Sequence, residues 1–154
     1  MLLIMNVRHI GEEQEIMKIR IESECFTQDW DKHPLYTAKF SKKAMVKMVA
    51  KLPGKLVTLD FNNEIIIGEI ISAKIINDKA IIQADIEEKF INCGRNIVPA
   101  YNVIKATSKK NNKGVERITY YDVDPICCGL TLNPSEKDRL KPLKIVSNKQ
   151  MKQT

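Results

Sequence analysis

Serine and histidine side chains are the residues of this chain that could form a hydrolytic site. Such chemistry needs a nucleophile with a general base within hydrogen-bond distance. The chain has two histidines, His9 and His33, and His33 directly precedes a proline. None of the serines lies beside a histidine in the sequence; they are Ser23, Ser41, Ser72, Ser108, Ser135 and Ser147. Although a fold can bring distant residues together, the sequence itself indicates no catalytic dyad.

A metal site, a phosphate-binding loop or a pair of catalytic carboxylates would each need its own pattern of residues. The cysteines form no C-x-x-C pair, and neither histidine lies at ligand spacing from one, so we expect no metal site and four reduced thiols: Cys25, Cys93, Cys127 and Cys128. No G-x-x-x-x-G-K-[ST] or G-x-G-x-x-G loop is present, and we expect no cofactor. The acids Asp60, Glu64 and Glu69 are predicted to be turn and surface residues rather than a catalytic pair.

Length and composition predict one globular domain. The 154 residues, 44% apolar and 29% charged, can bury a single core. The longest apolar runs are too short to cross a bilayer, and no cleavage site follows the opening MLLIM, so we expect no membrane contact and no signal peptide. The net charge of +6 favours an acidic partner. Much of this charge lies after residue 136, where six basic residues accompany one acid, Asp138.

The elements that would position any site are mostly strands. In "MKIRIESECF" (17–26) one face carries Ile19, Ile21, Ser23 and Cys25, which predicts a half-buried strand. Further strands are expected near 55–60, 64–76, 79–86, 97–107, 115–123 and 126–132. Turns are expected at Asn62-Asn63, Asn77-Asp78, 109–114 and Asp124-Pro125, and the segment 27–36 is expected to be a loop. The segment "SKKAMVKMVAKL" predicts one helix with Ser41 as N-cap, ended by Pro53-Gly54.

This pattern predicts a mainly β fold, a closed or nearly closed antiparallel barrel or sandwich with one main helix. We expect an N-terminal extension over 1–16, the domain over 17–133 and a basic tail over 134–154. The alternation of "LLIMNVR" at 2–8 and the charge of the tail suggest arms that contact a neighbour, with solvated chain ends as the alternative.

Four phrases of the sequence, spanning roughly residues 40 to 138, carry a family resemblance. They are "SKKAMVKMVAKLPGKLVTLDF", "IIGEIISAKIINDKAIIQADI", "IVPAYNVIKA" and "GVERITYYDVDPICCGLTLNPSEKD". In this order they resemble the prohead (capsid maturation) proteases of tailed bacteriophages. That family has a helix, a strand with the catalytic histidine ahead of an isoleucine-glycine pair, a serine strand and a closing "x-L-T-x-x-P" phrase. The resemblance implies the fold of herpesvirus assembly proteases, a β-barrel ringed by helices.

The resemblance does not extend to the catalytic residues. Counting back from Gly68, the place of the histidine falls on Phe61, beside Asp60. Counting back from Tyr101, the place of the serine falls on Val98. Phenylalanine cannot accept a proton and valine cannot attack a carbonyl, so the resemblance implies a protease fold with no catalytic residue.

An inactive assembly-protease fold suggests a binding module. The expected function is a non-enzymatic accessory or decoration protein of a phage capsid, located in the virion after assembly in the host cytoplasm. Its expected partners are the major capsid protein and other copies of itself. Two alternatives stay open: an active maturation protease with a displaced dyad, and a basic β-barrel that binds nucleic acid.

Overall fold

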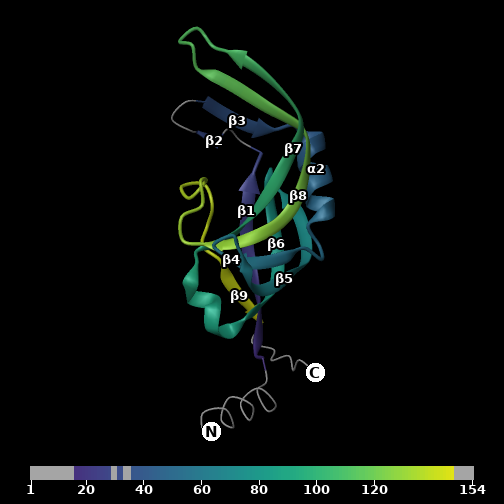
Figure 1. Cartoon of the computed structure of the whole chain (residues 1–154), viewed down its shortest axis with the longest axis vertical. Coiled ribbons are helices and arrows are strands. Elements are labelled where there is room, and N and C mark those ends of the chain that lie inside the picture. Colours follow the sequence, from purple (N-terminus) through teal and green to yellow (C-terminus); the bar gives the residue numbers. More distant parts are fainter. Residues whose placement is uncertain (1–15, 29–30, 33–35, 148–154) are drawn as a thin grey trace, which may run out of the picture.

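The computed structural model describes residues 16–28, 31–32 and 36–147, without the side chains of 31, 32 and 147. Both histidines and the predicted strand at 2–8 lie outside this part of the chain. The elements are β1 (Lys18–Thr27), β2 (Asp31–Lys32), β3 (Tyr36–Phe40), α2 (Lys42–Lys51), β4 (Leu56–Leu59), β5 (Asn62–Ile76), β6 (Lys79–Glu87), the 3₁₀ helix η1 (Glu88–Cys93), β7 (Asn96–Lys110), β8 (Glu116–Thr131) and β9 (Lys144–Ser147) (Figure 1).

The strands form one mixed sheet in the order β2-β3-β8-β4-β5-β6-β1-β9, and β7 pairs with the other edge of β8. The mainly β prediction with one main helix is confirmed, but the sheet is not wholly antiparallel. Both β3 and β4 run parallel to β8, along successive parts of the same edge. The segment 27–36, expected to be a loop, contributes β2 and the start of β3.

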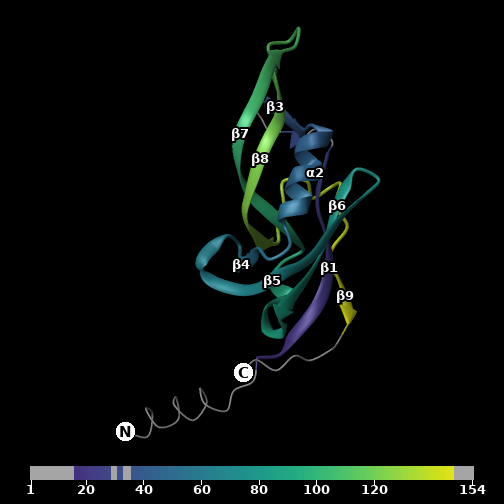
Figure 2. The ribbon, with the colours of Figure 1, turned by 90° about the vertical axis from the view of Figure 1, so that its right-hand side faces the viewer.

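Helix α2 explains the parallel pairing. It connects β3 to β4 and lies along β8 between the places where these two strands pair with β8 (Figure 2). Lys47 hydrogen-bonds Asp122, and one turn later Lys51 Nζ lies 2.6 Å from Asp124 Oδ1. Because strand, helix and strand advance along β8 in one direction, both strands must be parallel to it. A pairing this distant in sequence leaves no mark in local periodicity.

The predicted turn at Asp124-Pro125 is wrong, because β8 continues through it. Pairing with β7 shifts between Ala100 and Tyr101, which face Cys127 and Pro125, so Ile126 is an extra residue in β8. Pro125 lies in the stretch of β8 that faces α2, between the two parallel strands. A proline is tolerated where one edge of a strand has no strand partner or where a bulge interrupts the ladder.

The sheet curls so that β7 returns to β1. The hydroxyl of Ser23 on β1 accepts a hydrogen bond from the N–H of Ile97 at 2.9 Å, and Asn96 Nδ2 donates to the carbonyl of Glu24 at 3.1 Å. Side chains rather than a continuous strand ladder therefore join the two ends of the curled sheet.

The core lies inside this curl and under α2. On β1 the predicted inward residues Ile19, Ile21, Ser23 and Cys25 are all buried, as the alternation indicated. The helix begins as predicted, since Ser41 Oγ accepts from the N–H of Ala44 at 3.0 Å. The apolar stripe of α2 is buried against the sheet through Ala44, Met45, Met48, Val49 and Leu52.

The region predicted as a basic tail is folded as far as the structure describes it. Strand β9 pairs antiparallel with β1, and Leu140 is buried. The carbonyl of Lys141 accepts from Asn96 Nδ2 at 2.8 Å, and the N–H of Leu143 donates to the carbonyl of Arg95 at 2.9 Å. Packing therefore continues well beyond the domain boundary that the sequence suggested after Asn133.

Candidate functional site

The turn between β4 and β5 holds the first residue that the sequence singled out. The turn consists of Asp60 and Phe61, flanked by the pair Leu59 and Asn62, whereas the sequence predicted it at Asn62-Asn63. Both turn residues have positive φ, 49° and 63°, as a two-residue hairpin of this type requires. Positive φ is uncommon for a bulky side chain such as that of Phe61, so the surroundings must compensate for its cost.

The ring of Phe61 lies over Gly129 on β8. A Cβ atom on Gly129 would stand 2.8 Å from two ring carbons, so the ring occupies space that any other residue would fill. Gly129 is paired with Val98 on β7. Directly opposed residues project from the same face of an antiparallel pair, which places the Val98 side chain on the face that carries the ring.

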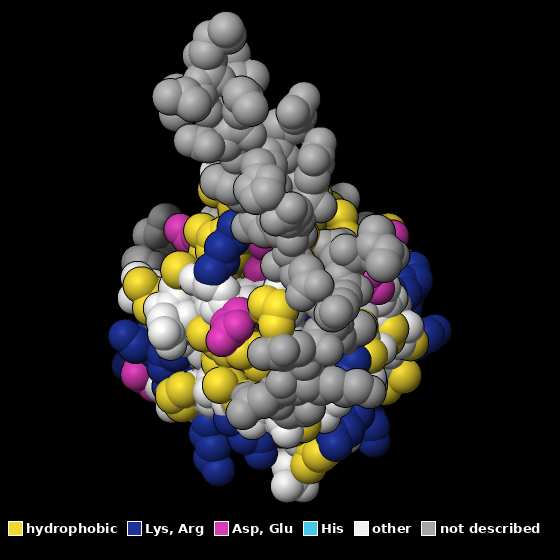
Figure 3. All heavy atoms as spheres, turned by 90° about the horizontal axis from the view of Figure 1, so that it is seen from below, with side chains coloured by type: hydrophobic (Ala, Val, Ile, Leu, Met, Phe, Trp, Pro, Cys, Tyr) yellow, Lys and Arg dark blue, Asp and Glu magenta, His cyan; other side chains and the backbone are white. Residues whose placement is uncertain are grey.

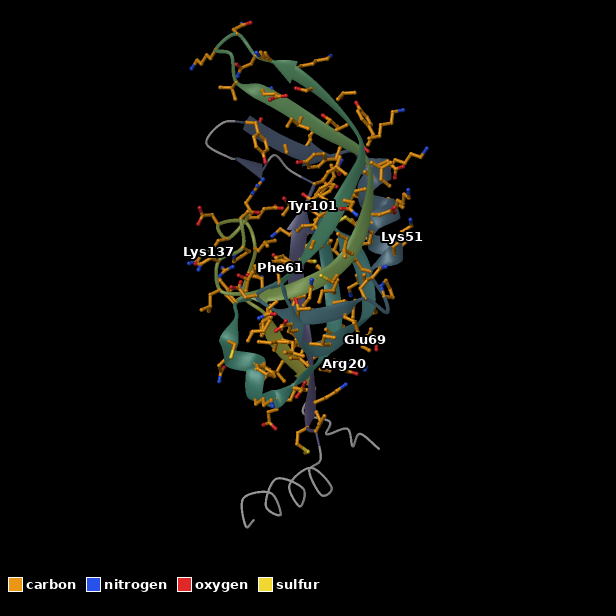
Figure 4. All side chains as sticks on the ribbon, viewed as in Figure 1. Arg20, Lys51, Phe61, Glu69, Tyr101 and Lys137 are labelled. Atoms are coloured by element: carbon orange, nitrogen blue, oxygen red, sulfur yellow. The ribbon has the colours of Figure 1, made fainter. Side chains whose placement is uncertain are left out.

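Phe61 and Val98 therefore flank Gly129 on one face of the strand pair, and that face is the outside of the curled sheet. The residues on either side of Gly129, Cys128 and Leu130, are fully buried in the core, and alternation turns Gly129 to the opposite face. Phe61 remains 38% exposed there. Figure 4 labels Phe61 at its turn, with Tyr101 where β7 leaves the body.

Neither of these two side chains can transfer a proton. Phe61 has no titratable atom, Val98 has no nucleophile, and the nearby hydroxyl of Thr58 donates to the carbonyl of Cys128 at 3.2 Å. The two positions that the resemblance assigns to a dyad thus lie on either side of Gly129, and both carry apolar side chains.

The serines whose side chains the structure describes have structural roles or lie on the surface. Ser23 joins β1 to β7, and Ser41 caps α2. Ser108 hydrogen-bonds Glu116 across the β7–β8 hairpin. Ser72 lies on the outer part of β5, while Ser135 borders a small cavity.

A cavity of about 80 Å³, lined in part by Val98, lies between β1, β3, β7 and the segment after β8. Its carboxylate is Glu136, which is 8% exposed. Glu136 accepts hydrogen bonds from the hydroxyl and the N–H of Thr27, and Arg139 Nη2 lies 3.6 Å from its Oε2. A carboxylate held in this way anchors the C-terminal segment on β1. No sequence pattern predicted this role, because "PSEKD" lacks periodicity.

Cys25 borders the same cavity, but it is a poor nucleophile. Burial raises the pKa of its thiol well above the usual value, and the neighbouring Cys128 and Glu136 raise it further. The thiolate is the reactive form, so Cys25 stays protonated and inert at neutral pH.

The long β7–β8 hairpin is a feature that the sequence reasoning did not single out. From Asn102 to Lys110 every residue of β7 is exposed. Residues 101–121 include five basic side chains and one acid, Glu116, which gives the hairpin a net charge of +4; the basic residues are Lys105, Lys109, Lys110, Lys113 and Arg117. The basic character that the sequence analysis placed in the C-terminal tail is therefore shared with this projection.

In the part of the chain that the structure describes, no cluster of three or more histidine, cysteine or acidic residues could hold a metal ion. None of the described helices has the length and apolar character needed to span a membrane. Comparison with protein-family models finds no matching family, and comparisons with curated proteins and with solved structures find no similar protein.

Proposed function

We propose that this chain is a non-enzymatic accessory protein of a tailed-phage capsid that binds the shell protein. The observation that carries the proposal is the position of Phe61 and Val98 on either side of Gly129. The resemblance implies a catalytic histidine and serine at these two positions, and neither a phenyl ring nor an isopropyl group can take their place. A fold of this kind without its dyad would serve binding rather than hydrolysis.

The surface of the molecule also supports a role in binding. Large apolar side chains are exposed on the body and on the hairpin. They include Ile66 on β5, Ile104 on β7, Ile126 on β8 and Leu132 directly after β8, each at least half exposed. The hairpin extends from the body at the end opposite the start of β1 (Figures 1 and 2). A projecting two-stranded arm reaches a neighbouring subunit in an assembly better than it serves a compact enzyme.

The charge distribution favours a protein partner over nucleic acid. Seen from the end where β1 begins, lysine and arginine side chains lie on several sides of the rim, with hydrophobic side chains between them (Figure 3). Binding of single-stranded nucleic acid uses a continuous basic groove with aromatic side chains for stacking. On the hairpin, Tyr121 is the large aromatic side chain that the structure leaves exposed.

Co-sedimentation with empty shells of the encoding phage tests the proposal. The full chain should pellet with shells assembled from the major capsid protein and stay in solution without them. Peptidase activity on that shell protein or its scaffold, abolished by His33→Ala, would instead establish a protease with a displaced dyad. Binding to duplex DNA that falls steeply with salt, without binding to shells, would establish the nucleic-acid alternative.

A further inference from the structure

The outer edge of β7 is a strand edge without a strand partner. Among the residues that the structure describes, β7 pairs with β8 alone, while β8 also pairs with β3 and β4. All nine residues from Asn102 to Lys110 are exposed. An edge of this length presents a row of backbone donors and acceptors to which another extended chain can add.

The end of the hairpin shows which backbone groups point outward. The N–H of Asn111 donates to the carbonyl of Val115 at 2.9 Å, so the groups of Asn111 point toward β8. Orientation alternates along an antiparallel strand. The register of β7 with β8 is regular from Ala106 to Lys110, so the N–H and C=O of Ala106, Ser108 and Lys110 point away from β8.

The side chains around this edge are basic. Lys105, Lys109 and Lys110 are exposed, and the structure gives none of them an ion pair with a described residue. A second copy of β7 is a poor occupant, because it would bring the three lysines of one strand beside the three of the other, and self-pairing over 104–110 would place Lys105 opposite Lys109. Like charges directly opposed across two strands are destabilising, whereas acids at those places would be favourable.

We propose that the outer edge of β7, from Ala106 to Lys110, binds an extended acidic segment of a partner protein as an added antiparallel strand. The outward groups of Ala106, Ser108 and Lys110 would make the backbone hydrogen bonds, and the lysines would select acidic side chains. This deepens the proposed function and rests on it for the identity of the partner, which is then an acidic segment of the shell protein.

Two variants of Ser108 separate the loss of its backbone N–H from the loss of its side-chain hydrogen bond. Ser108→Pro removes the outward N–H and also the hydrogen bond from the Ser108 side chain to Glu116. Ser108→Ala removes the side-chain bond and keeps the N–H, so it is the matched control. A proline is compatible with the open edge of a strand. The double variant Lys109→Glu with Lys110→Glu tests the charge requirement, and circular dichroism confirms that each full-length variant is folded.

Each protein is measured with empty shells and with an acidic peptide of alternating glutamate and valine, eight residues long. We expect Ser108→Ala to bind both like the parent, while Ser108→Pro and the double glutamate variant bind at least about tenfold more weakly. Bound peptide should slow hydrogen exchange at Ala106, Ser108 and Lys110. The corresponding lysine–valine peptide should not bind.

Equal binding of Ser108→Pro and Ser108→Ala to the peptide and the shells would overturn the added-strand proposal and leave the proposed function intact. Loss of binding in the glutamate variant alone would also overturn it, because it would indicate a purely electrostatic partner such as nucleic acid. If the parent binds the peptide at β7 but not the shells, the edge proposal holds and the capsid function fails. If the parent does not bind the acidic peptide, the edge proposal is wrong whether or not the shells are bound.

Discussion

The ring of Phe61 rests on Gly129, so that a β-carbon at Gly129 would stand only 2.8 Å from the ring. Phe61 has a positive φ, which normally disfavours a bulky side chain. Its ring fits because Gly129 has no side chain on the face that receives it. Replacement of Gly129 by alanine should therefore destabilise the fold by about 1–3 kcal/mol.

A double-mutant cycle checks this contact. Phe61→Ala removes the ring, so Gly129→Ala should cost clearly less in that background than in the parent. Chemical denaturation of the four proteins measures the coupling, which we expect to exceed about 0.5 kcal/mol. Additive effects would contradict the contact between turn and strand.

Helix α2 should contribute stability through its buried face only. Met48 is fully buried, and Met48→Ala should cost about 2–5 kcal/mol because it leaves a cavity between helix and sheet. Val46 on the same helix is 51% exposed, so Val46→Ala should change the free energy of unfolding by less than about 0.5 kcal/mol. Similar losses for the two variants would mean that α2 is not packed as described.

Glu136 should hold the C-terminal segment on β1. Glu136→Ala leaves the N–H and hydroxyl of Thr27 without their acceptor in a buried place, which should cost about 1–3 kcal/mol. Hydrogen exchange should become faster in Leu140 and β9. Asp138→Asn, an exposed change two residues away, is the control and should leave exchange there as it was.

Lowering the pH should destabilise the same region, because Glu24 loses its charge when it is protonated. Burial favours a raised pKa for this residue, but hydrogen bonds from the Lys141 N–H and the Lys79 ammonium outweigh it and leave the pKa below its usual 4.5. A lowered pKa in the folded state means that ionised Glu24 stabilises the fold above pH 4.5, and this contribution disappears as the pH falls through the folded value.

The measurement is the unfolding free energy from pH 7 to pH 3.5 for the parent and for Glu24→Gln. The stability difference between them should shrink on acidification. Glu64→Gln, an exposed change on β5, is the control for the loss of one acidic charge from the surface. A constant deficit of Glu24→Gln at every pH would contradict the role of the charge.

The cysteines should differ sharply in reactivity. Cys93 is exposed, Cys127 is half-buried with a pKa raised by burial, and Cys25 and Cys128 are buried. Iodoacetamide should therefore label Cys93 first, Cys127 more slowly, and the buried pair only after unfolding. Mass spectrometry of the labelled peptides gives the order. Early labelling of Cys25 in the folded chain would contradict the burial of its thiol.

Local patterns predicted local structure well. The alternation around Ile21 and the stripe around Met48 report directly which face is buried, and the structure confirms both. The sequence could not show that β3 and β4 run parallel to β8, because that depends on α2 lying along β8. It likewise missed Glu136, whose partner Thr27 is distant in the chain. Nor could it show that Phe61 and Val98 flank Gly129, because these three residues are distant from one another in the chain.

The most direct test of a non-enzymatic capsid role is the intact mass and copy number of this chain in purified virions and proheads of the encoding phage, relative to the major capsid protein. We predict an uncleaved chain in both kinds of particle, in a constant ratio to the shell protein. Its absence from virions and proheads alike would contradict the account.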